Sequence, residues 1–166
     1  MRQSGDILMV HNNTWLGKAI RCITRSSFNH CGIFVSEDEL VEATYKGVEQ
    51  NNISKFDSLV TSNKCSYSVY RVKNITSEQI QTVVNFVKQE VGDKYEITQI
   101  IELFFVFVFH LPRNLNLIDD KKQWICSELV AEAFQDAGIK FFDKIRVDDM
   151  VPGDIPKSDI VEQVII

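Results

Sequence analysis

Residues 124–137 read WICSELVAEAFQDA, and this stretch has the clearest helical pattern in the chain. Its apolar side chains recur at the spacing that places them on one side of a helix, and Gly138 follows as a C-terminal stop. The stripe comprises Leu129, Val130, Ala133, Phe134 and Ala137. Cys126 lies at its N-terminal end. The segment therefore predicts an amphipathic helix with a cysteine near its start.

A cysteine at the start of a helix is a candidate nucleophile, because the reactive form of cysteine is the thiolate. An unperturbed thiol has a pKa of about 8.5 and is mostly protonated at neutral pH. The free N–H groups and the dipole at a helix N-terminus favour an anion, and a nearby histidine can take the proton. A free cysteine is otherwise a small buried apolar residue. A catalytic interpretation of Cys126 therefore requires a histidine partner.

The chain has three histidines, and their settings differ. His11 lies in a polar loop after the first apolar run, and His110 ends a long apolar segment. His30 lies at the start of residues 29–35, NHCGIFV, whose β-branched and aromatic residues predict a strand. A sheet would hold the His30 side chain rigidly, which suits either a hydrogen-bonded structural residue or a general base.

The first half of the chain contains several further strand patterns. Short runs with β-branched and aromatic residues are separated by polar or glycine-containing turns, as in antiparallel hairpins. The predicted strands are residues 7–10, 29–35, 40–45, 48–51 and 66–72, and residues 15–23 have helical spacing. The first half is therefore predicted to be mainly sheet.

The second half changes to a helical period. Thr76 is a hydroxyl cap ahead of an acidic first turn, and apolar residues then recur at helical spacing until Gly92. Residues 160–166 resemble a closing strand. Strands followed by helices indicate an α+β fold, and 166 residues suit a single domain spanning 1–166.

Residues 97–111 form the least typical stretch, with Phe and Val in close succession. The segment is shorter than the roughly 20 residues that a membrane-spanning helix needs. It suits either a buried core helix or an apolar surface, such as a lid, an acyl-chain channel or a membrane contact. On the second interpretation, Phe105 and Phe107 contact the apolar part of a substrate.

The net charge, the N-terminal sequence and the cysteine spacing limit the partners, location and cofactors that we expect. The formal net charge of -5 argues against binding to nucleic-acid phosphates, which requires a concentrated basic surface. The N-terminus has no long apolar core of the secretory type, so the expected location is the cytoplasm. The cysteines have no CxxC or zinc-type spacing, so we expect reduced thiols and no metal or organic cofactor. The four positions are Cys22, Cys31, Cys65 and Cys126.

Four ordered segments resemble the circularly permuted NlpC-type papain-like cysteine hydrolases, in their YiiX/YebB-like branch. They are SGDILMV at 4–10, SSFNHCGIFV at 26–35, LVEATYKGV at 40–48 and WICSELVAEAF at 124–134. In that family the histidine strand precedes the cysteine helix, which reverses the order in papain. The VPGDI segment at 151–155 extends the resemblance over most of the chain. The resemblance implies a permuted papain-like fold, with an antiparallel sheet packed against helices.

The resemblance also implies roles for individual residues. It makes Cys126 the nucleophile, His30 the general base and Glu42 the polar third member that orients His30. Tyr95 resembles the tyrosine that precedes the catalytic helix in the family, and its hydroxyl would contact the substrate. The backbone N–H of Cys126 would contribute to an oxyanion hole.

The expected distance between Glu42 and His30 is large for a direct contact. A three-residue hairpin would place Glu42 opposite Phe34, four residues and roughly 13 Å from His30 along the strand. A bulge, strong coiling or a register shift would then have to bring the two side chains together. Thr44 is the alternative partner for His30.

The resemblance implies acyl transfer through a thioester on Cys126, by a cysteine hydrolase or acyltransferase that acts on an amide or ester bond. The expected substrate is a peptide amide or an acyl or lipid conjugate, and peripheral contact with a membrane is compatible with both. The alternative is a non-catalytic lipid- or partner-binding module on the same fold. A small structural protein is a third interpretation, and the oligomeric state is left open.

Overall fold

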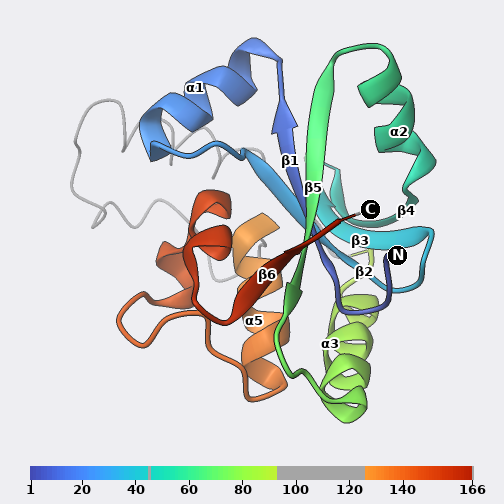
Figure 1. The fold of residues 1–166 in the computed structure, drawn as a ribbon, viewed down its shortest axis with the longest axis vertical. Coiled ribbons are helices and arrows are strands. Elements are labelled where there is room, and N and C mark those ends of the chain that lie inside the picture. Colours follow the sequence, from blue (N-terminus) through green and yellow to red (C-terminus); the bar gives the residue numbers. More distant parts are fainter. Residues whose placement is uncertain (45, 93–125, 166) are drawn as a thin grey trace.

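A computed structural model describes residues 1–44, 46–92 and 126–165, and its centre is a six-stranded antiparallel sheet (Figure 1). The strands are β1 Ile7–Asn12, β2 His30–Phe34, β3 Glu39–Thr44, β4 Gly47–Asn52, β5 Cys65–Val72 and β6 Val161–Val164. Their order across the sheet is β4-β3-β2-β1-β5-β6. The strand and helix patterns of the sequence are confirmed in the described residues, apart from one helix that they did not indicate.

Helices lie against both faces of this sheet. They are α1 Trp15–Thr24, α2 Ser54–Thr61, α3 Ser77–Gln89 and α5 Cys126–Asp136, followed by the short 3-10 helices η1 Val147–Asp149 and η2 Pro152–Lys157. Figure 1 shows α3 and α5 side by side in the lower half and α2 beyond β5 in the upper half. The α+β class and the antiparallel sheet packed against helices are as predicted.

Alternate residues of the central strands divide the core into two clusters. Ile7 and Met9 face α3 and α5, whereas Leu8 and Val10 face α2, because successive strand side chains point to opposite faces. β2 follows the same rule, with Ile33 in the first cluster and Phe34 in the second. Both faces of β1 and β2 are therefore buried, which explains their nearly continuous apolar sequence.

The helix α2 was missing from the sequence prediction. Its eight residues are mostly polar, and Phe56 is its one buried side chain, so no helical stripe is visible in the sequence. Ile53 and Phe56 attach this segment to the cluster around Phe34. Because α2 covers the face that carries His30, its absence from the prediction left that side of the site undescribed.

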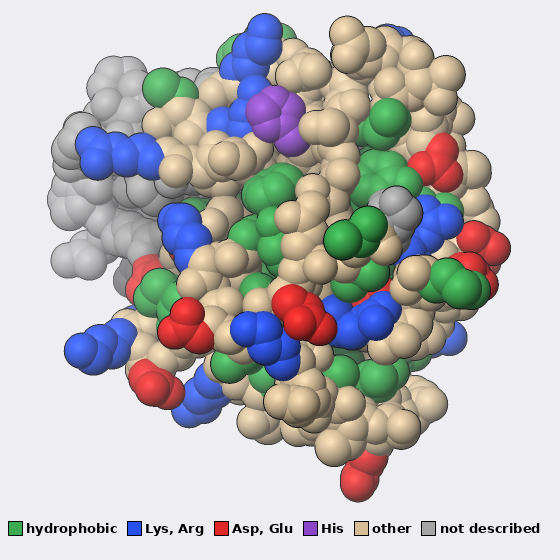
Figure 2. Space-filling model, viewed as in Figure 1, with side chains coloured by type: hydrophobic (Ala, Val, Ile, Leu, Met, Phe, Trp, Pro, Cys, Tyr) green, Lys and Arg blue, Asp and Glu red, His purple; other side chains and the backbone are tan. Residues whose placement is uncertain are grey.

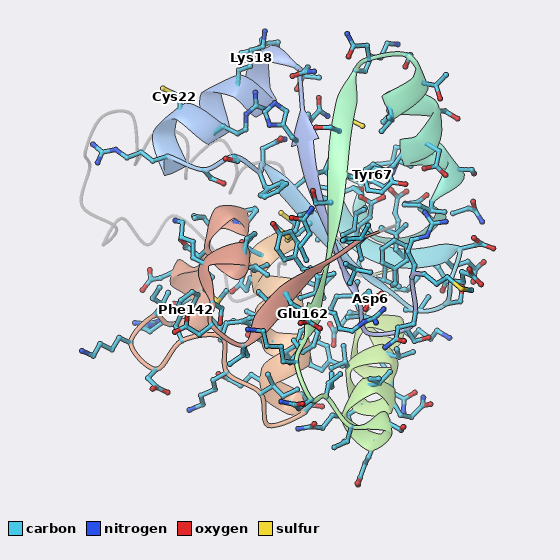
Figure 3. All side chains as sticks on the ribbon, viewed as in Figure 1. Asp6, Lys18, Cys22, Tyr67, Phe142 and Glu162 are labelled. Carbon is cyan, nitrogen blue, oxygen red and sulfur yellow. The ribbon has the colours of Figure 1, made fainter. Side chains whose placement is uncertain are left out.

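The hydroxyl cap predicted at Thr76 is confirmed. Thr76 and Gln79 form a reciprocal capping box at the start of α3, each side chain bonding the other's backbone N–H. Near the N-terminus, the buried Asp6 carboxylate accepts hydrogen bonds from Arg71 at 2.7 and 2.8 Å and from the Gln3 backbone (Figure 3). That ion pair attaches the turn that precedes β1 to strand β5.

Figure 2 shows acidic and basic side chains interspersed over one face of the molecule, with hydrophobic side chains between them. Within the described ranges, no helix is both long and apolar enough to cross a membrane. The predicted apolar segment 97–111, with Phe105 and Phe107, lies outside the described residues, as does Tyr95.

Candidate active site

The pairing of β2 with β3 brings His30 and Glu42 together. The register pairs Phe34 with Leu40, and its continuation by two residues places Glu42 opposite Gly32. Glu42 is therefore diagonal to His30 on the same face of the sheet, and the His30 Nε2 to Glu42 Oε2 distance is 2.5 Å. The expectation that Glu42 lies opposite Phe34, roughly 13 Å from His30, is wrong.

The position of the hairpin turn accounts for the difference. The backbone N–H of Val35 donates to the Glu39 carbonyl, so residues 36–38 form the turn, one residue earlier than the 37–39 turn that the expected register requires. The register is thereby shifted by two residues, which keeps every side chain on its expected face. A register shift is one of the three changes, with a bulge and strong coiling, that we expected could bring Glu42 to His30.

Gly32 leaves space for the diagonal contact. A Cβ atom at this position would lie 3.0 Å from Leu40 Cδ1 and from the Val41 carbonyl oxygen, and 3.1 Å from Glu42 Cβ. A side chain there would push against the strand that carries the carboxylate. The glycine of the NHCGIF segment is thus explained by the close approach of β3.

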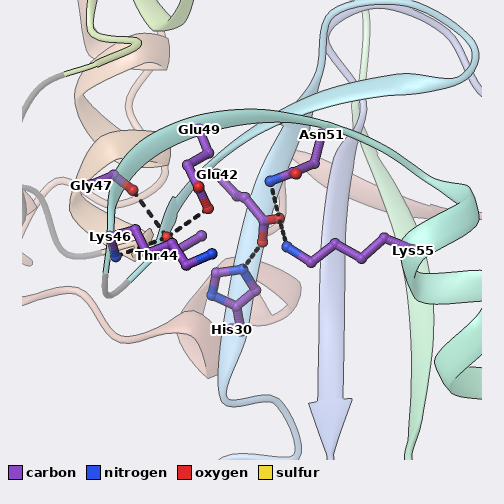
Figure 4. Close-up of polar contacts among 8 residues, drawn as sticks. All are labelled: His30, Glu42, Thr44, Lys46, Gly47, Glu49, Asn51 and Lys55. Atoms are coloured by element: carbon purple, nitrogen blue, oxygen red, sulfur yellow. Dashed lines mark hydrogen bonds and ion pairs between the residues drawn. The ribbon is translucent and has the colours of Figure 1, made fainter.

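Glu42 is almost completely buried, with 2 % of its surface exposed, and both of its carboxylate oxygens are bonded (Figure 4). Oε2 faces His30, and Oε1 accepts hydrogen bonds from Lys55 Nζ at 2.7 Å and Asn51 Nδ2 at 2.9 Å. Burial raises the pKa of Glu42, but His30 and Lys55 outweigh it and lower the pKa to about 2. Glu42 is therefore a buried anion throughout the physiological pH range.

His30 lies between Glu42 and Cys126. Burial lowers the pKa of His30, but hydrogen bonds and charge interactions with Cys126 and Glu42 raise it to about 10. The ring stacks on Phe56 of α2, with 6.4 Å between centroids and 19° between planes. Since Nε2 is bonded to Glu42, the other ring nitrogen, Nδ1, is left for the sulfur of Cys126.

Cys126 is the first described residue of α5 and is 9 % exposed. The thiol and the backbone N–H of Cys31 both donate to its sulfur, and His30 adds a third hydrogen bond. The Cys31 thiol and His30 hold the pKa of Cys126 well below its ordinary value, against the effect of burial. Burial and the contact with Cys126 raise the pKa of the Cys31 thiol, so Cys31 stays a protonated donor.

The structure thus brings three predicted residues, Cys126, His30 and Glu42, into one bonded series. Thr44, the alternative partner for His30, instead hydrogen-bonds Glu49 at 2.9 Å. His11, near the C-terminal end of β1, instead bonds the Ser27 carbonyl at 2.8 Å.

The remaining cysteines differ from Cys126 in their surroundings. All four cysteines are free thiols. Cys22 is exposed on α1, away from the sheet (Figure 3), and Cys65 is buried on the α2 side. Cys31 makes the largest contribution to the lowered pKa of Cys126, and His30 adds to it.

Sequence reasoning missed Cys31, Asn51 and Lys55. Cys31 was visible as the neighbour of His30, but strand alternation turns its side chain to the opposite face, towards α5. Asn51 lies near the end of β4 and Lys55 in the first turn of α2, and no periodic pattern in either element identifies a partner for a buried carboxylate. The pairing of β3 with β4 brings Asn51 to Glu42, and the position of α2 brings Lys55 to it.

An ionised cysteine on a helix, paired with a histidine that a carboxylate supports, defines a papain-like cysteine hydrolase in its permuted order. The chain belongs to the family of permuted papain-like amidases, YaeF/YiiX, C92, whose pattern matches residues 2–151. The family and the fold predicted from the ordered segments are confirmed.

Two relatives illustrate the range of this likeness. The probable lipoprotein peptidase YaeF of Escherichia coli K12 is 27 % identical over 156 residues, covering 81 % of this chain and 56 % of that protein. This chain therefore spans about half the length of that relative. The crystal structure of the metalloprotein YiiX of Escherichia coli O157:H7 has a TM-score of 0.69 and 20 % identity, covering 98 % and 96 % of the two chains.

The description as a metalloprotein applies to YiiX. Over residues 1–44, 46–92 and 126–165 of this chain, no group of three or more His, Cys, Asp or Glu side chains is placed to hold a metal ion.

Proposed function

We propose that this chain hydrolyses an amide bond through an acyl thioester on Cys126. The observation that carries the proposal is the bonded series of Cys126, His30 and Glu42, in which a thiolate faces an imidazolium supported by a buried carboxylate. A protein that only binds a ligand has no need of an ionised thiol. The amidase family of the chain supports hydrolysis in preference to the binding module.

The chemistry follows from the charges of the resting site. The Cys126 thiolate attacks the carbonyl carbon, and the carbonyl oxygen takes the negative charge of the tetrahedral intermediate, near the Cys126 N–H. Nδ1–H of His30 then donates its proton to the departing amine as the C–N bond breaks. Neutral His30 next removes a proton from water, which attacks the thioester and releases the acid and the thiolate. Glu42 holds Nε2–H and stabilises the imidazolium in each cycle.

For the substrate, we propose an amide that joins a long acyl chain or an acylated residue to a peptide. Support comes from the name of the relative YaeF, a probable lipoprotein peptidase, and from the apolar sequence of residues 97–111. On this proposal Phe105 and Phe107 contact the acyl chain and Tyr95 contacts the polar part. Transfer to an acceptor other than water, as in an acyltransferase, is the second possible outcome of the same thioester.

The test compares two amides that differ in chain length. Purified protein is incubated with an N-palmitoyl dipeptide amide and with its N-acetyl counterpart, and intact mass spectrometry measures acylation of Cys126 and release of the acid. We expect a transient adduct and faster turnover of the palmitoyl amide. Cys126→Ala should abolish both, and Cys22→Ala, at an exposed thiol, should change neither.

The outcomes separate the alternatives. Turnover of the acetyl amide alone would retain the hydrolase and reject the acyl-chain substrate. Tight binding of the palmitoyl amide without any adduct or product would reject hydrolysis in favour of the binding module.

A further inference from the structure

The second oxygen of Glu42 is bonded from the side of the sheet that α2 covers. Lys55, in the first turn of α2, and Asn51, near the end of β4, donate to Oε1 at 2.7 and 2.9 Å. Figure 4 shows both side chains converging on the carboxylate opposite His30. The orientation of Oε2 towards His30 is thus determined by contacts on Oε1.

Lys55 is different from Asn51 in one respect, because it supplies a charge as well as a hydrogen bond. The site alternates in sign from the Cys126 thiolate through the His30 imidazolium and the Glu42 carboxylate to the Lys55 ammonium. A buried carboxylate needs a cationic partner or takes up a proton. His30 loses its charge whenever it gives its proton to a leaving group, which leaves Lys55 as the remaining cation bonded to Glu42 among the described residues.

We propose that Lys55 is a positioning residue for this site, which keeps Glu42 ionised and directed at His30 while the histidine is neutral. The inference rests on the proposed function. Without the ammonium, Glu42 would compete with the leaving group for the proton of His30. The neighbouring Phe56 reinforces the arrangement, since its ring stacks on His30 and lies 5.3 Å from Lys55 Nζ.

Other titratable groups also face Glu42. Glu49 of β4 lies directly opposite Glu42 in the register and accepts a hydrogen bond from Thr44. Cys126 and Cys31 approach from the α5 side, through His30 and the strand β2. Glu49 and the Cys126 thiolate are both negative neighbours, and they increase the need for a cation beside Glu42.

A competing role for Lys55 follows from its exposure. Its side chain is 44 % exposed, so the ammonium could instead bind a carboxylate of the substrate. The two roles differ in what they change, because a substrate contact alters KM and leaves the ionisation of Cys126 as it was. A positioning role alters the ionisation even when no substrate is present.

The experiment measures the pH dependence of Cys126 alkylation by iodoacetamide, with the modified residue identified by mass spectrometry. The folded full chain is compared with Lys55→Met, Lys55→Arg and Lys157→Met, the last removing a lysine that pairs with Asp154 outside the site. In Lys55→Met, Glu42 should take up a proton at a higher pH, which weakens the imidazolium and protonates the thiolate. We expect the acid midpoint of alkylation to rise by about one pH unit, the lower end of the effect of a close opposite charge, because Lys55 is partly exposed.

Lys55→Arg should restore the wild-type midpoint, and Lys157→Met should leave it unchanged. An unchanged midpoint in Lys55→Met, or an equal rise in Lys55→Arg, would overturn the positioning role. A raised KM for the palmitoyl dipeptide amide, without any shift of the midpoint, would show a substrate contact and also overturn it. If wild-type Cys126 is alkylated no faster than Cys22, the proposed function fails, and that result is distinguishable from a failure of Lys55 alone.

Discussion

The two faces of the sheet contribute to the site by different means. On the α5 face, Cys126 lies in an apolar cluster, and hydrogen bonds from Cys31 and His30 stabilise its thiolate. On the α2 face, Glu42 is also buried, but charged partners stabilise it. Both groups are anions in surroundings that oppose charge, and each depends on a specific donor set from its own side.

His30 connects the two faces because it is the first residue of β2. At the end of a strand, the ring is less confined to one face of the sheet. One ring nitrogen therefore bonds the Glu42 carboxylate, and the other bonds the Cys126 sulfur. A histidine in the middle of the strand would be confined to one face. The comparison therefore predicts that changes on the α2 face act on Cys126 only through His30.

The largest effect is expected for His30→Ala, which separates the two faces. The thiolate loses its imidazolium and the leaving amine loses its proton donor, so turnover should fall by about 10²- to 10⁴-fold. Hydrolysis of the palmitoyl dipeptide amide measures this loss. His11→Ala is the matched control and should leave the rate unchanged, since the His11 ring bonds the Ser27 carbonyl rather than Cys126 or Glu42. Equal losses in both variants would point to a general effect of histidine removal on folding.

The two faces also differ in how far the sequence predicts them. The helix α5 has a regular apolar stripe with Cys126 at its start, so periodicity predicts the helix and its candidate nucleophile, although it does not indicate the donor Cys31. The hairpin between β2 and β3 was identified, but its register was not, because the polar residues 36–39 allow a three-residue turn at more than one position.

The α2 face was hidden for a different physical reason. α2 is short and mostly polar, and its role is to place Lys55 and Phe56 over a buried ion pair. Such contacts depend on the position of one element over another, and no local pattern encodes them. The resemblance predicted that Glu42 is the partner of His30, but it gave no indication of what holds Glu42.

A smaller effect is expected when the space between the two strands is filled. In Gly32→Ala the new Cβ meets Leu40, the Val41 carbonyl and Glu42 at 3.0 to 3.1 Å, so β3 must move. We expect a loss of about 1–3 kcal/mol in the free energy of unfolding, together with a slower reaction, because Glu42 is displaced from His30. Urea unfolding and amide hydrolysis measure the two quantities.

Gly138→Ala is the control for Gly32→Ala. Gly138 has a φ of +75° and no atom within 4 Å of an added Cβ, so the substitution strains the backbone without touching the site. We expect a loss of stability of about 1 kcal/mol and an unchanged rate. A normal rate in Gly32→Ala would mean that the diagonal contact tolerates movement of β3.

On the α5 face, the corresponding test removes the thiol of Cys31. Cys31→Ala leaves the backbone N–H but deletes the side-chain donor, so the pKa of Cys126 should rise and its acid alkylation midpoint should move up by about one pH unit. Cys31→Ser retains a donor and should shift the midpoint less. A larger shift in the serine variant than in the alanine variant would contradict the donor role.

The smallest effect concerns the pH dependence of stability, where His30 and Cys126 act in opposite directions. The pKa of His30 is raised from 6.5 to about 10, so its contribution is complete below pH 6.5 and is lost as the pH rises through 10. The pKa of Cys126 is lowered from 9.0, so its contribution is complete above pH 9 and is lost as the pH falls. Between these values the gain of one offsets the loss of the other, because the proton only moves from the sulfur to the ring.

The difference in unfolding free energy between wild type and the double variant His30→Ala/Cys126→Ala, which lacks both titrating groups, should therefore change by less than about 1 kcal/mol from pH 6.5 to 8.5 and decrease on either side. Urea titrations at half-unit pH intervals measure it. A steady slope across this window would mean that folding takes up or releases a net proton. The resting site would then hold a neutral thiol or a neutral histidine, and the two faces would not be joined by an ion pair.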